Sequence, residues 1–275
     1  MTSTTALMAG KKGLSMGLAN DKSIAWGIVQ ALHAHGAQIA ISYQNEIMEK
    51  RVLPLAQQLG DSALLIKCDV SDSASVEACF KELGDKWGKI DFVVHAIAFS
   101  DKNELKGRTI DTSLENFLNT MHISCYSFLE TCRCASPIIN EGGSIVTLSY
   151  LGGERVLPNY NIMGVAKAAL EAAVRYAASD MGQQGVRVNA ISAGPIKTLA
   201  ASGIGDFRKI LHWNELNAPL RRNVTQEEVG MATLGLLSAC GTGISGEVLH
   251  VDCGYHIQGM LNIDNAEATA KSLLD

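Results

Sequence analysis

The 275-residue sequence has no excess of basic residues, no long apolar run and no paired-cysteine motif. The formal net charge is -5, without the dense basic stripe that nucleic-acid binding requires. No apolar run is long enough to cross a bilayer. The segment Met1–Leu7 lacks the regions of a secretory signal and is expected to be a disordered lead-in. We therefore expect a cytoplasmic protein that binds neither nucleic acid nor membrane.

The seven cysteines are scattered, and no CxxC pair occurs among them. Cys132 and Cys134 fall in a helical pattern, where residues two apart do not face each other. Such thiols are typical of small core residues in a reducing compartment. The sequence therefore predicts neither a disulfide nor a metal site.

Aromatic residues are scarce at 5%, whereas hydrophobic residues together make up 47%, enough for a large core. Short apolar runs alternate with amphipathic stretches, which predicts an α/β fold with a Rossmann-like, doubly wound parallel sheet of about seven strands and helices on both faces. No Pro/Ser-rich linker interrupts residues 1–275, so we expect one domain. The expected strands are 13–16, 38–42, 63–67, 92–95, 144–148, 187–191 and 247–251, and the expected helices are 24–35, 47–59, 75–86, 113–135, 160–181 and 226–238.

Residues 192–224 break this alternation, because they follow a strand but do not return promptly to the sheet. A long excursion after the end of a strand is often a substrate loop or lid. Its apolar residues also fit a surface helix with a core-facing stripe, and the two interpretations are compatible. Residues 261–275 form a mildly acidic tail, with no clear partner in the sequence.

Tyr160 and Lys167 are separated by six residues in a predicted helix. Seven steps at ~3.6 residues per turn make almost two turns, so both side chains can lie on one face, offset by ~10 Å along the axis. A phenol and an ammonium on one face can hold a cofactor and stabilise a developing oxyanion. Taken alone, the pair fits two half-buried, solvated helix residues better than a functional site.

The turn after the first predicted strand lacks the GxGxxG motif of many dinucleotide-binding proteins. Gly17 would allow a tight exit from the strand, Ser23 can cap the next helix, and Gly27 would let that helix approach the sheet. The N-terminus of that helix attracts a diphosphate. An ordinary strand-turn-helix with a serine cap explains the same residues.

The ends of the next strands favour NADH over NADPH, because residues 43–46 contain no Arg or Lys for a 2′-phosphate. Gln44 occupies the place of an acidic ribose ligand, unless Glu46 serves. Asp69 could accept a hydrogen bond from the adenine amino group. Residues 95–99 place small side chains where the backbone must approach a cofactor.

Together these segments resemble the NADH-dependent enoyl-acyl-carrier-protein reductases, a divergent branch of the short-chain dehydrogenase/reductase superfamily. The match runs from about Gly10 to Met260. Cys253 stands where a glycine is common in the family. The motifs that carry the resemblance are Gly17-x5-Ser23-Ile24-x2-Gly27, Tyr43-Gln44-Asn45, Cys68-Asp69-Val70, Leu148-Ser149-Tyr150-Leu151-Gly152, Tyr160-x6-Lys167, the segment 187–196 and the segment 246–252.

The resemblance implies hydride transfer from NADH to the β-carbon of a trans-2-enoyl thioester in the elongation cycle of type II fatty-acid biosynthesis. Tyr160 would donate to the enolate oxygen, and Lys167 would hold the nicotinamide ribose and make the phenol more acidic. Tyr150 would line the acyl site near the thioester. The implied cofactor residues are Gly17, Ser23, Ile24, Gln44, Asp69, Val70, Ile97, Lys167, Ile196 and Thr198; the implied substrate residues are Ala98, Ser100, Tyr150, Tyr160 and Phe207.

The family also implies a homotetramer and an acidic carrier protein as partner. Because this chain is itself negative, docking would need a local basic patch. Arg208 and Lys209 are the first candidates, Arg221 and Arg222 the second, and each pair fits a solvated surface equally well. The apolar residues Leu199, Ile204, Phe207 and Ile210 would cover the acyl chain.

Two other functions remain to be distinguished. A ketoreductase of the same superfamily would usually pair a catalytic serine with Tyr-x3-Lys, which differs from the spacing here. A cofactor-binding regulator without turnover would have no need of Tyr150, Tyr160 and Lys167 together.

Overall fold

The structure is a computed structural model that describes residues 6–199, 201, 205–260, 265–267 and 270–271, with backbone alone at 61–62. Most of the expected lead-in, Ile204 in the excursion and much of the tail 261–275 therefore lie outside the described residues.

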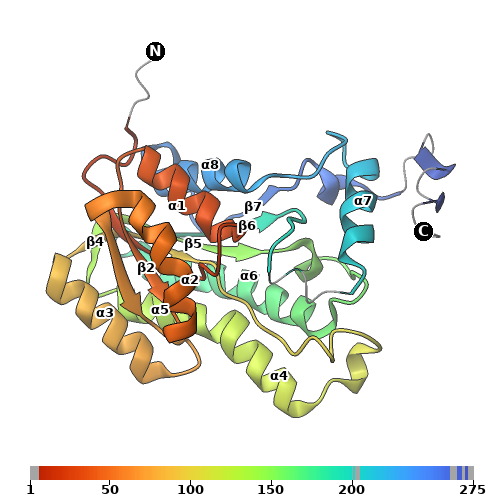
Figure 1. Cartoon of the computed structure of the whole chain (residues 1–275), viewed down its shortest axis with the longest axis horizontal. Helices are drawn as coiled ribbons and strands as arrows, with labels where there is room; N and C mark the ends of the chain where they lie inside the picture. Colours follow the sequence, from red (N-terminus) through yellow and green to blue (C-terminus); the bar gives the residue numbers. More distant parts are fainter. Residues whose placement is uncertain (1–5, 200, 202–204, 261–264, 268–269, 272–275) are drawn as a thin grey trace.

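Seven parallel strands form one sheet in the order β3-β2-β1-β4-β5-β6-β7 (Figure 1). This confirms the predicted Rossmann-like fold. The order reverses between β1 and β4, and ligands bind such sheets at that switch point. The strands are β1 (Lys12–Met16), β2 (Gln38–Tyr43), β3 (Ala63–Lys67), β4 (Ile90–His95), β5 (Ile139–Ser149), β6 (Arg187–Ala193) and β7 (Val248–Val251).

Helices cover both faces of the sheet, because successive strand side chains point to opposite sides. On β4, Phe92 and Val94 belong to one buried cluster and Val93 to the other. Figure 1 shows the two layers on either side of the strands. One layer contains α1 (Ile24–Ala34), α2 (Glu46–Ala56) and α8 (Gln226–Leu237); the other contains α3 (Ser73–Trp87), α4 (Leu114–Met121), α5 (Ser127–Ala135) and α6 (Asn161–Gly182).

The weakly apolar first strand lies at the centre of the sheet, between β2 and β4. Gly13 is required there, because a Cβ on it would lie 2.3 Å from the Phe92 carbonyl oxygen. At Gly13 the missing side chain therefore reflects close packing against β4. The expectation of a single domain stays a prediction.

The continuous helix predicted over 113–135 is wrong in detail, because a π-helical turn, His122–Tyr126, separates α4 from α5. In this turn the Ser124 hydroxyl donates to the Phe99 carbonyl and accepts from the Phe99 amide, both at 3.0 Å. The wider turn thus binds the loop that follows β4, and such turns often occur at functional sites.

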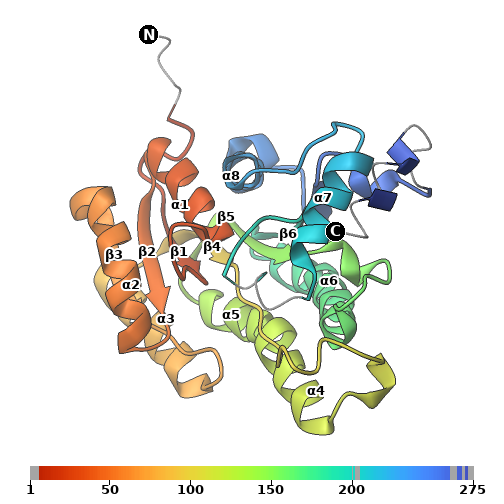
Figure 2. The same ribbon diagram turned by 45° about the vertical axis from the view of Figure 1, so that its right-hand side comes forward.

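Within the excursion, residues Phe207–Asn217 form the helix α7, so the surface-helix interpretation is correct for that part. Figures 1 and 2 show α7 standing apart from the helices that cover the sheet. Over the described part of the chain, none of the helices combines the length and apolar character needed to span a bilayer.

Candidate active site

Gly17 leaves β1 with φ +91°, a conformation that favours glycine. A Cβ on this residue would lie 2.0 Å from the Ala96 carbonyl oxygen, at the end of β4. The Ala96 amide in turn donates to the Met16 carbonyl at 3.1 Å. The turn therefore brings backbone from both sides of the switch point close together, as a cofactor cradle needs.

Ser23 takes the N-cap position of α1, but the predicted cap is wrong. Its hydroxyl accepts from the amides of Ala19 and Asn20 at 3.0 and 3.1 Å, because the turn folds back over it. Among the described residues, no side chain caps this end of α1, and its first turn contains no acidic residue. The helix N-terminus is thus free of competing anions and suits a diphosphate.

Gln44 and Asp69 follow β2 and β3, and the Gln44 Nε2 donates to Asp69 Oδ2 at 3.2 Å. The Ser71 hydroxyl and amide donate to Asp69 Oδ1. Burial raises the pKa of the Asp69 carboxyl, but these hydrogen bonds outweigh it and the net pKa is lowered. The two predicted adenosine-end residues therefore form one ionised, oriented acceptor site.

Tyr160 is not a helical residue, because α6 begins at Asn161 and Tyr160 is its N-cap. The predicted shared helical face is therefore wrong by one residue. The Tyr160 ring meets the Tyr150 ring edge-on, with centroids 5.2 Å apart. Among the described residues, none forms a hydrogen bond with the Tyr160 hydroxyl.

Tyr160 is flanked by two asparagines with positive φ, Asn159 at 58° and Asn161 at 40°. The Asn159 amide donates to the Gly205 carbonyl at 3.2 Å, and the Asn161 amide donates to the carbonyls of Glu104 and Gly107 at 3.3 and 3.2 Å. These side-chain hydrogen bonds connect the segment around Tyr160 to the loop at 104–107 and to Gly205 in the excursion. The sequence offered only the tolerance of asparagine for this conformation as a signal.

Lys167 is buried, and its Nζ donates to the Leu148 carbonyl at 2.7 Å. Desolvation lowers the pKa of Lys167 to about 8, although nearby Glu171 and Cys125 oppose that shift. Burial, followed by the fields of Tyr150 and Glu171, raises the pKa of the Tyr160 phenol. The expected acidic phenol is therefore contradicted. A neutral phenol is nevertheless the form that donates a hydrogen bond.

Two cavities meet at Tyr150 and Tyr160, which line both. Their volumes are about 440 and 570 Å³, in the range of small-molecule sites. The smaller cavity extends to Lys209 and Ile210 on α7. The larger one has in its wall Ile24, Ala98, Ser100, Tyr150, Tyr160, Ile196, Thr198 and Phe207, all predicted site residues.

The other predicted residues lie elsewhere around the same end of the sheet and do not line either cavity. Val70 is buried after β3, and Ile97 is half-buried after β4. Gly17, Ser23, Gln44 and Asp69 form the turns described above, and Lys167 lies beside the end of β5.

His95, at the end of β4, is a buried residue that sequence reasoning passed over as part of a small-residue turn. Its Nδ1 lies 3.0 Å from Thr147 Oγ1 and its Nε2 2.9 Å from Ser127 Oγ. Desolvation, and then the field of Lys167, lowers the pKa of His95 to about 3. The imidazole is therefore neutral and carries no charge into the site.

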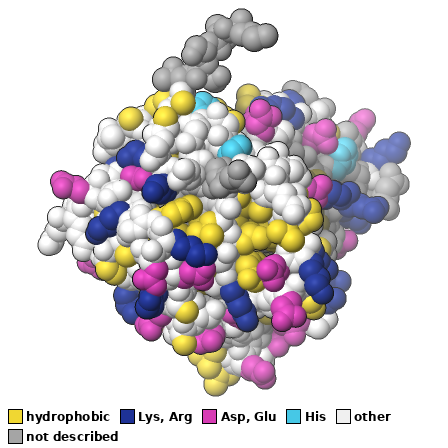
Figure 3. Space-filling model, turned by 60° about the vertical axis from the view of Figure 1, so that its left-hand side comes forward, with side chains coloured by type: hydrophobic (Ala, Val, Ile, Leu, Met, Phe, Trp, Pro, Cys, Tyr) yellow, Lys and Arg dark blue, Asp and Glu magenta, His cyan; other side chains and the backbone are white. Residues whose placement is uncertain are grey.

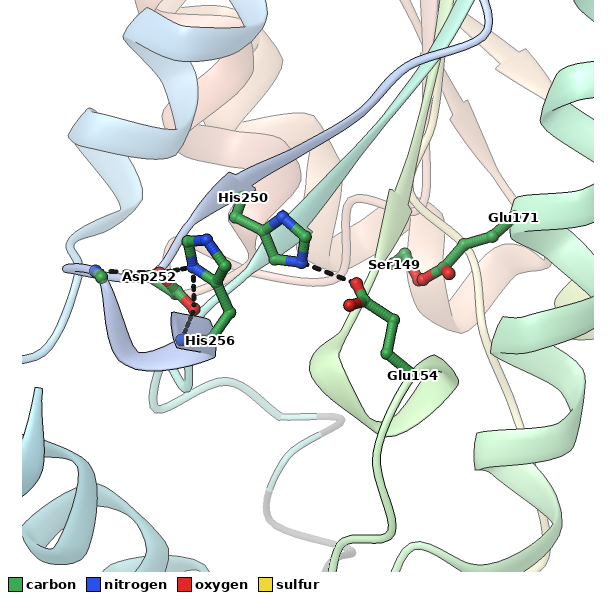
Figure 4. A network of polar contacts seen from close by, with 7 residues as sticks. Ser149, Glu154, Glu171, His250, Asp252 and His256 are labelled. Atoms are coloured by element: carbon green, nitrogen blue, oxygen red, sulfur yellow. Dashed lines mark hydrogen bonds and ion pairs between the residues drawn. The ribbon is translucent and has the colours of Figure 1, made fainter. Parts of the chain in front are cut away.

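A polar network that the sequence did not predict lies beside β5 and β7 (Figure 4). The Ser149 hydroxyl donates to the buried carboxylate of Glu171. His250 lies 2.6 Å from Glu154 and stacks on His256, with ring centroids 4.0 Å apart. Glu171 follows Lys167 by four residues, a spacing at which oppositely charged helical residues interact. That spacing was the signal available in the sequence.

The basic residues proposed for docking differ in their surroundings. Arg208 is exposed on α7, whereas Lys209 is half-buried and lines the smaller cavity. Arg222 pairs with Glu228 through two contacts of 2.8 and 2.5 Å. Figure 3 shows basic and acidic side chains interspersed around a central group of hydrophobic ones, without a continuous basic stripe on that face.

Both the sequence and the fold of this chain are similar to those of known proteins. The model of a family described as "Enoyl-(Acyl carrier protein) reductase" matches residues 17–256. Enoyl-[acyl-carrier-protein] reductase [NADH] 1 of Rhizobium meliloti is 60% identical, over 96% of this chain and 97% of that protein. The corresponding NADH enzyme of Bacillus cereus is 50% identical, over 92% and 99%.

Two solved structures have the same fold and similar sequences. An enoyl-(acyl-carrier-protein) reductase of Anaplasma phagocytophilum in complex with NAD gives a TM-score of 0.91 at 60% identity, covering 94% of this chain and 99% of that one. The Bacillus cereus reductase with NADP+ and an indole naphthyridinone gives 0.91 at 50% identity, covering 92% and 99%.

Proposed function

Because this chain belongs to the enoyl-(acyl-carrier-protein) reductase family, we propose that it reduces the trans-2 double bond of enoyl thioesters with NADH, in the elongation cycle of type II fatty-acid biosynthesis. The observation that carries the proposal is the placement of Tyr160. Its hydroxyl, which has no hydrogen-bond partner in the described part of the chain, stands where the two cavities meet, and Lys167 lies at the end of β5.

The residues around the switch point fit a bound NAD. Gly17 leaves room where a Cβ would clash with the Ala96 carbonyl, and the first turn of α1, all of it described, contains no acidic residue. Gln44 and Asp69 offer paired acceptors after β2 and β3. When bound, the cofactor supplies the hydride that adds to the β-carbon of the enoyl group.

Tyr160 acts on the thioester end of the substrate. Hydride addition pushes negative charge onto the thioester oxygen, and the neutral phenol donates a hydrogen bond to that developing oxyanion. Lys167 holds the nicotinamide ribose and adds a positive charge to the same region. Tyr150 lines the acyl site beside Tyr160, while Phe207 and Ile210 cover the apolar chain.

A spectrophotometric assay tests this function. The protein is mixed with NADH and crotonyl-CoA, and NADH absorbance is followed. Consumption with crotonyl-CoA but not with acetoacetyl-CoA supports enoyl reduction. The reverse preference would indicate a ketoreductase, and binding of NADH without turnover on either thioester would indicate a regulator.

We expect NADH to be preferred over NADPH, because the Gln44–Asp69 pair presents acceptor oxygens and no cation toward the site of a 2′-phosphate. The measurement is the ratio of kcat/KM for the two cofactors at physiological ionic strength. A ratio near or below one would contradict this assignment. The NADP+ complex of the Bacillus cereus relative makes the comparison informative.

For docking of the acidic carrier protein we propose Arg208, with Lys209 in support. Arg208 is exposed on α7 above the substrate cavity, whereas Arg222 is engaged by Glu228. Arg208→Glu should raise KM for a carrier-bound enoyl substrate and leave KM for crotonyl-CoA unchanged. Lys50→Glu, an exposed reversal on α2, is the control. Equal effects on both substrates would rule out docking at this site.

We further propose a homotetramer in the cytoplasm. Exposed apolar side chains on α4, the π turn and α6, among them Leu118, Tyr126 and Val165, support association of subunits. All seven cysteines are free thiols, as in reducing compartments. Light scattering during size-exclusion chromatography gives the subunit number directly, and a monomer would contradict the assembly.

A further inference from the structure

Glu171 is a buried acid that the mechanism above does not use. It lies on α6, one turn beyond Lys167, and only 7% of its surface is exposed. Its one hydrogen-bond donor among the described residues is the Ser149 hydroxyl, a neutral group. A buried carboxylate is costly unless it is hydrogen-bonded and paired with an opposite charge. Lys167 is the buried cation on the same helix.

We propose that Glu171 is a positioning residue for the reduction: its carboxylate keeps Lys167 in the ammonium form and, through Ser149, fixes α6 against the end of β5. The proposal rests on the proposed function, because its consequence is the ability of Lys167 to hold the cofactor. Glu171 itself does not line either cavity and acts through Lys167.

The geometry of attachment is specific. The Lys167 Nζ donates to the Leu148 carbonyl, and the Glu171 carboxylate accepts from the Ser149 hydroxyl. Two residues one helical turn apart on α6 therefore form hydrogen bonds with consecutive residues of β5. Tyr160 is the N-cap of the same helix, and Tyr150 follows Ser149 in the chain. A slip of α6 along β5 would therefore move the two tyrosines relative to each other.

Titratable groups on three elements interact with Lys167. Lys167 faces Glu171 on its own helix, Cys125 on the π turn and the neutral His95 on β4. Cys125 is a thiol whose pKa is raised by burial, so at neutral pH it supplies no negative charge. Glu171 is therefore the anionic neighbour that opposes deprotonation of Lys167.

Glu171 has further neighbours of both signs. The pKa of Glu171 is raised overall, because burial is the largest effect and Glu154 adds to it. The Ser149 hydrogen bond, His250 and Arg175 oppose this rise. Figure 4 shows Glu154 in contact with His250 and lying between His250 and the Ser149–Glu171 pair. The Ser149 hydrogen bond and the nearby Arg175 guanidinium thus oppose protonation of the carboxylate that stabilises Lys167.

Two substitutions separate charge from attachment. In Glu171→Gln the amide oxygen can still accept from Ser149, but the negative charge is lost. The alkaline limb of kcat/KM, expected near the Lys167 pKa of about 8, should move down by about one pH unit, the lower end of the effect of a nearby opposite charge. Activity should fall about fivefold at pH 8 and change little at pH 6.

Ser149→Ala removes the attachment and keeps the charge, so kcat should fall at every pH while the alkaline limb stays in place. Asp180→Asn, at an exposed position near the end of the same helix, controls for the loss of one charge and should leave the profile unchanged. Thermal unfolding of each variant checks that the fold is retained.

NADH binding, followed by fluorescence across the same pH range, gives a readout independent of turnover. In Glu171→Gln, NADH affinity should weaken at a lower pH than in the wild type. An unchanged pH profile in both assays would overturn the proposal, even if the variant melted at a lower temperature. A wild-type protein that binds NADH but reduces no enoyl thioester would refute the proposed function instead, while the binding titration would still test Glu171.

Discussion

Replacing Tyr160 with phenylalanine should nearly abolish enoyl reduction without weakening the fold. Packing contacts fix the position of the Tyr160 ring. It packs edge-on against Tyr150, and Gly152 approaches so closely that a Cβ there would lie 2.3 Å from the Tyr160 ring. Phenylalanine keeps those contacts. The substitution therefore removes one hydroxyl and little else.

The size of the effect follows from what that hydroxyl does. A buried donor aimed at a developing oxyanion contributes about 3–4 kcal/mol to the transition state, so kcat should fall about 10²- to 10³-fold. Because the hydroxyl has no partner among the described residues, its removal should leave the free energy of unfolding unchanged or slightly higher. NADH affinity should change little, since Lys167 is intact.

Steady-state rates at saturating NADH and crotonyl-CoA, with melting curves, measure both quantities. Tyr150→Phe is the matched control: that ring also lines both cavities, and its loss of activity should be about tenfold or less. The residual activity of Tyr160→Phe should keep its alkaline limb near pH 8, where Lys167 loses its proton. A loss below about fivefold, or equal losses in the two variants, would refute the assignment of Tyr160 as the donor.

Other predictions concern single interactions. Thr225→Ala should lower the free energy of unfolding by about 1 kcal/mol in urea titrations, because it removes the capping box of α8, and Thr225→Ser should not. Gly88→Ala, in open space at φ +73°, should cost about 1–2 kcal/mol by the same titration; Gly17→Ala should cost more and weaken NADH binding, because its Cβ meets the Ala96 carbonyl. Arg187→Met should cost about 2–3 kcal/mol, since the buried guanidinium binds backbone carbonyls at the end of α8 and in the turn after it; an unchanged melting temperature would contradict that role.

Much of the fold could be predicted because its signals are local. Strands buried on both faces require continuous apolar runs, and the alternation of such runs with amphipathic stretches left few topologies open. The positions of the strand ends followed, and with them the neighbourhood of Gly17, Gln44 and Asp69. The reaction itself was predicted from resemblance, because helix geometry does not distinguish enoyl from carbonyl reduction.

Prediction failed where the folded backbone makes contacts that the residue pattern does not specify, some between distant segments and some within a turn. The π turn in the helix predicted over 113–135 depends on Ser124 meeting the backbone of Phe99. Ser23 fits a cap by sequence, but the turn folds over its hydroxyl. Cys253, where the family often has glycine, takes φ 59°, and only the folded backbone reveals that requirement.

The sequence by itself determined the order of strands and helices and the parallel sheet, because periodicity is a property of the chain. Its resemblance to a family, and not the spacing alone, predicted Tyr160 and Lys167 as the residues of the chemistry. Tertiary structure decided their ionisation. Tyr160 and Lys167 have pKa values set by desolvation, and Glu171 gains its influence only because α6 is pressed against the end of β5. Burial depends on what packs around a residue, and local sequence does not encode that.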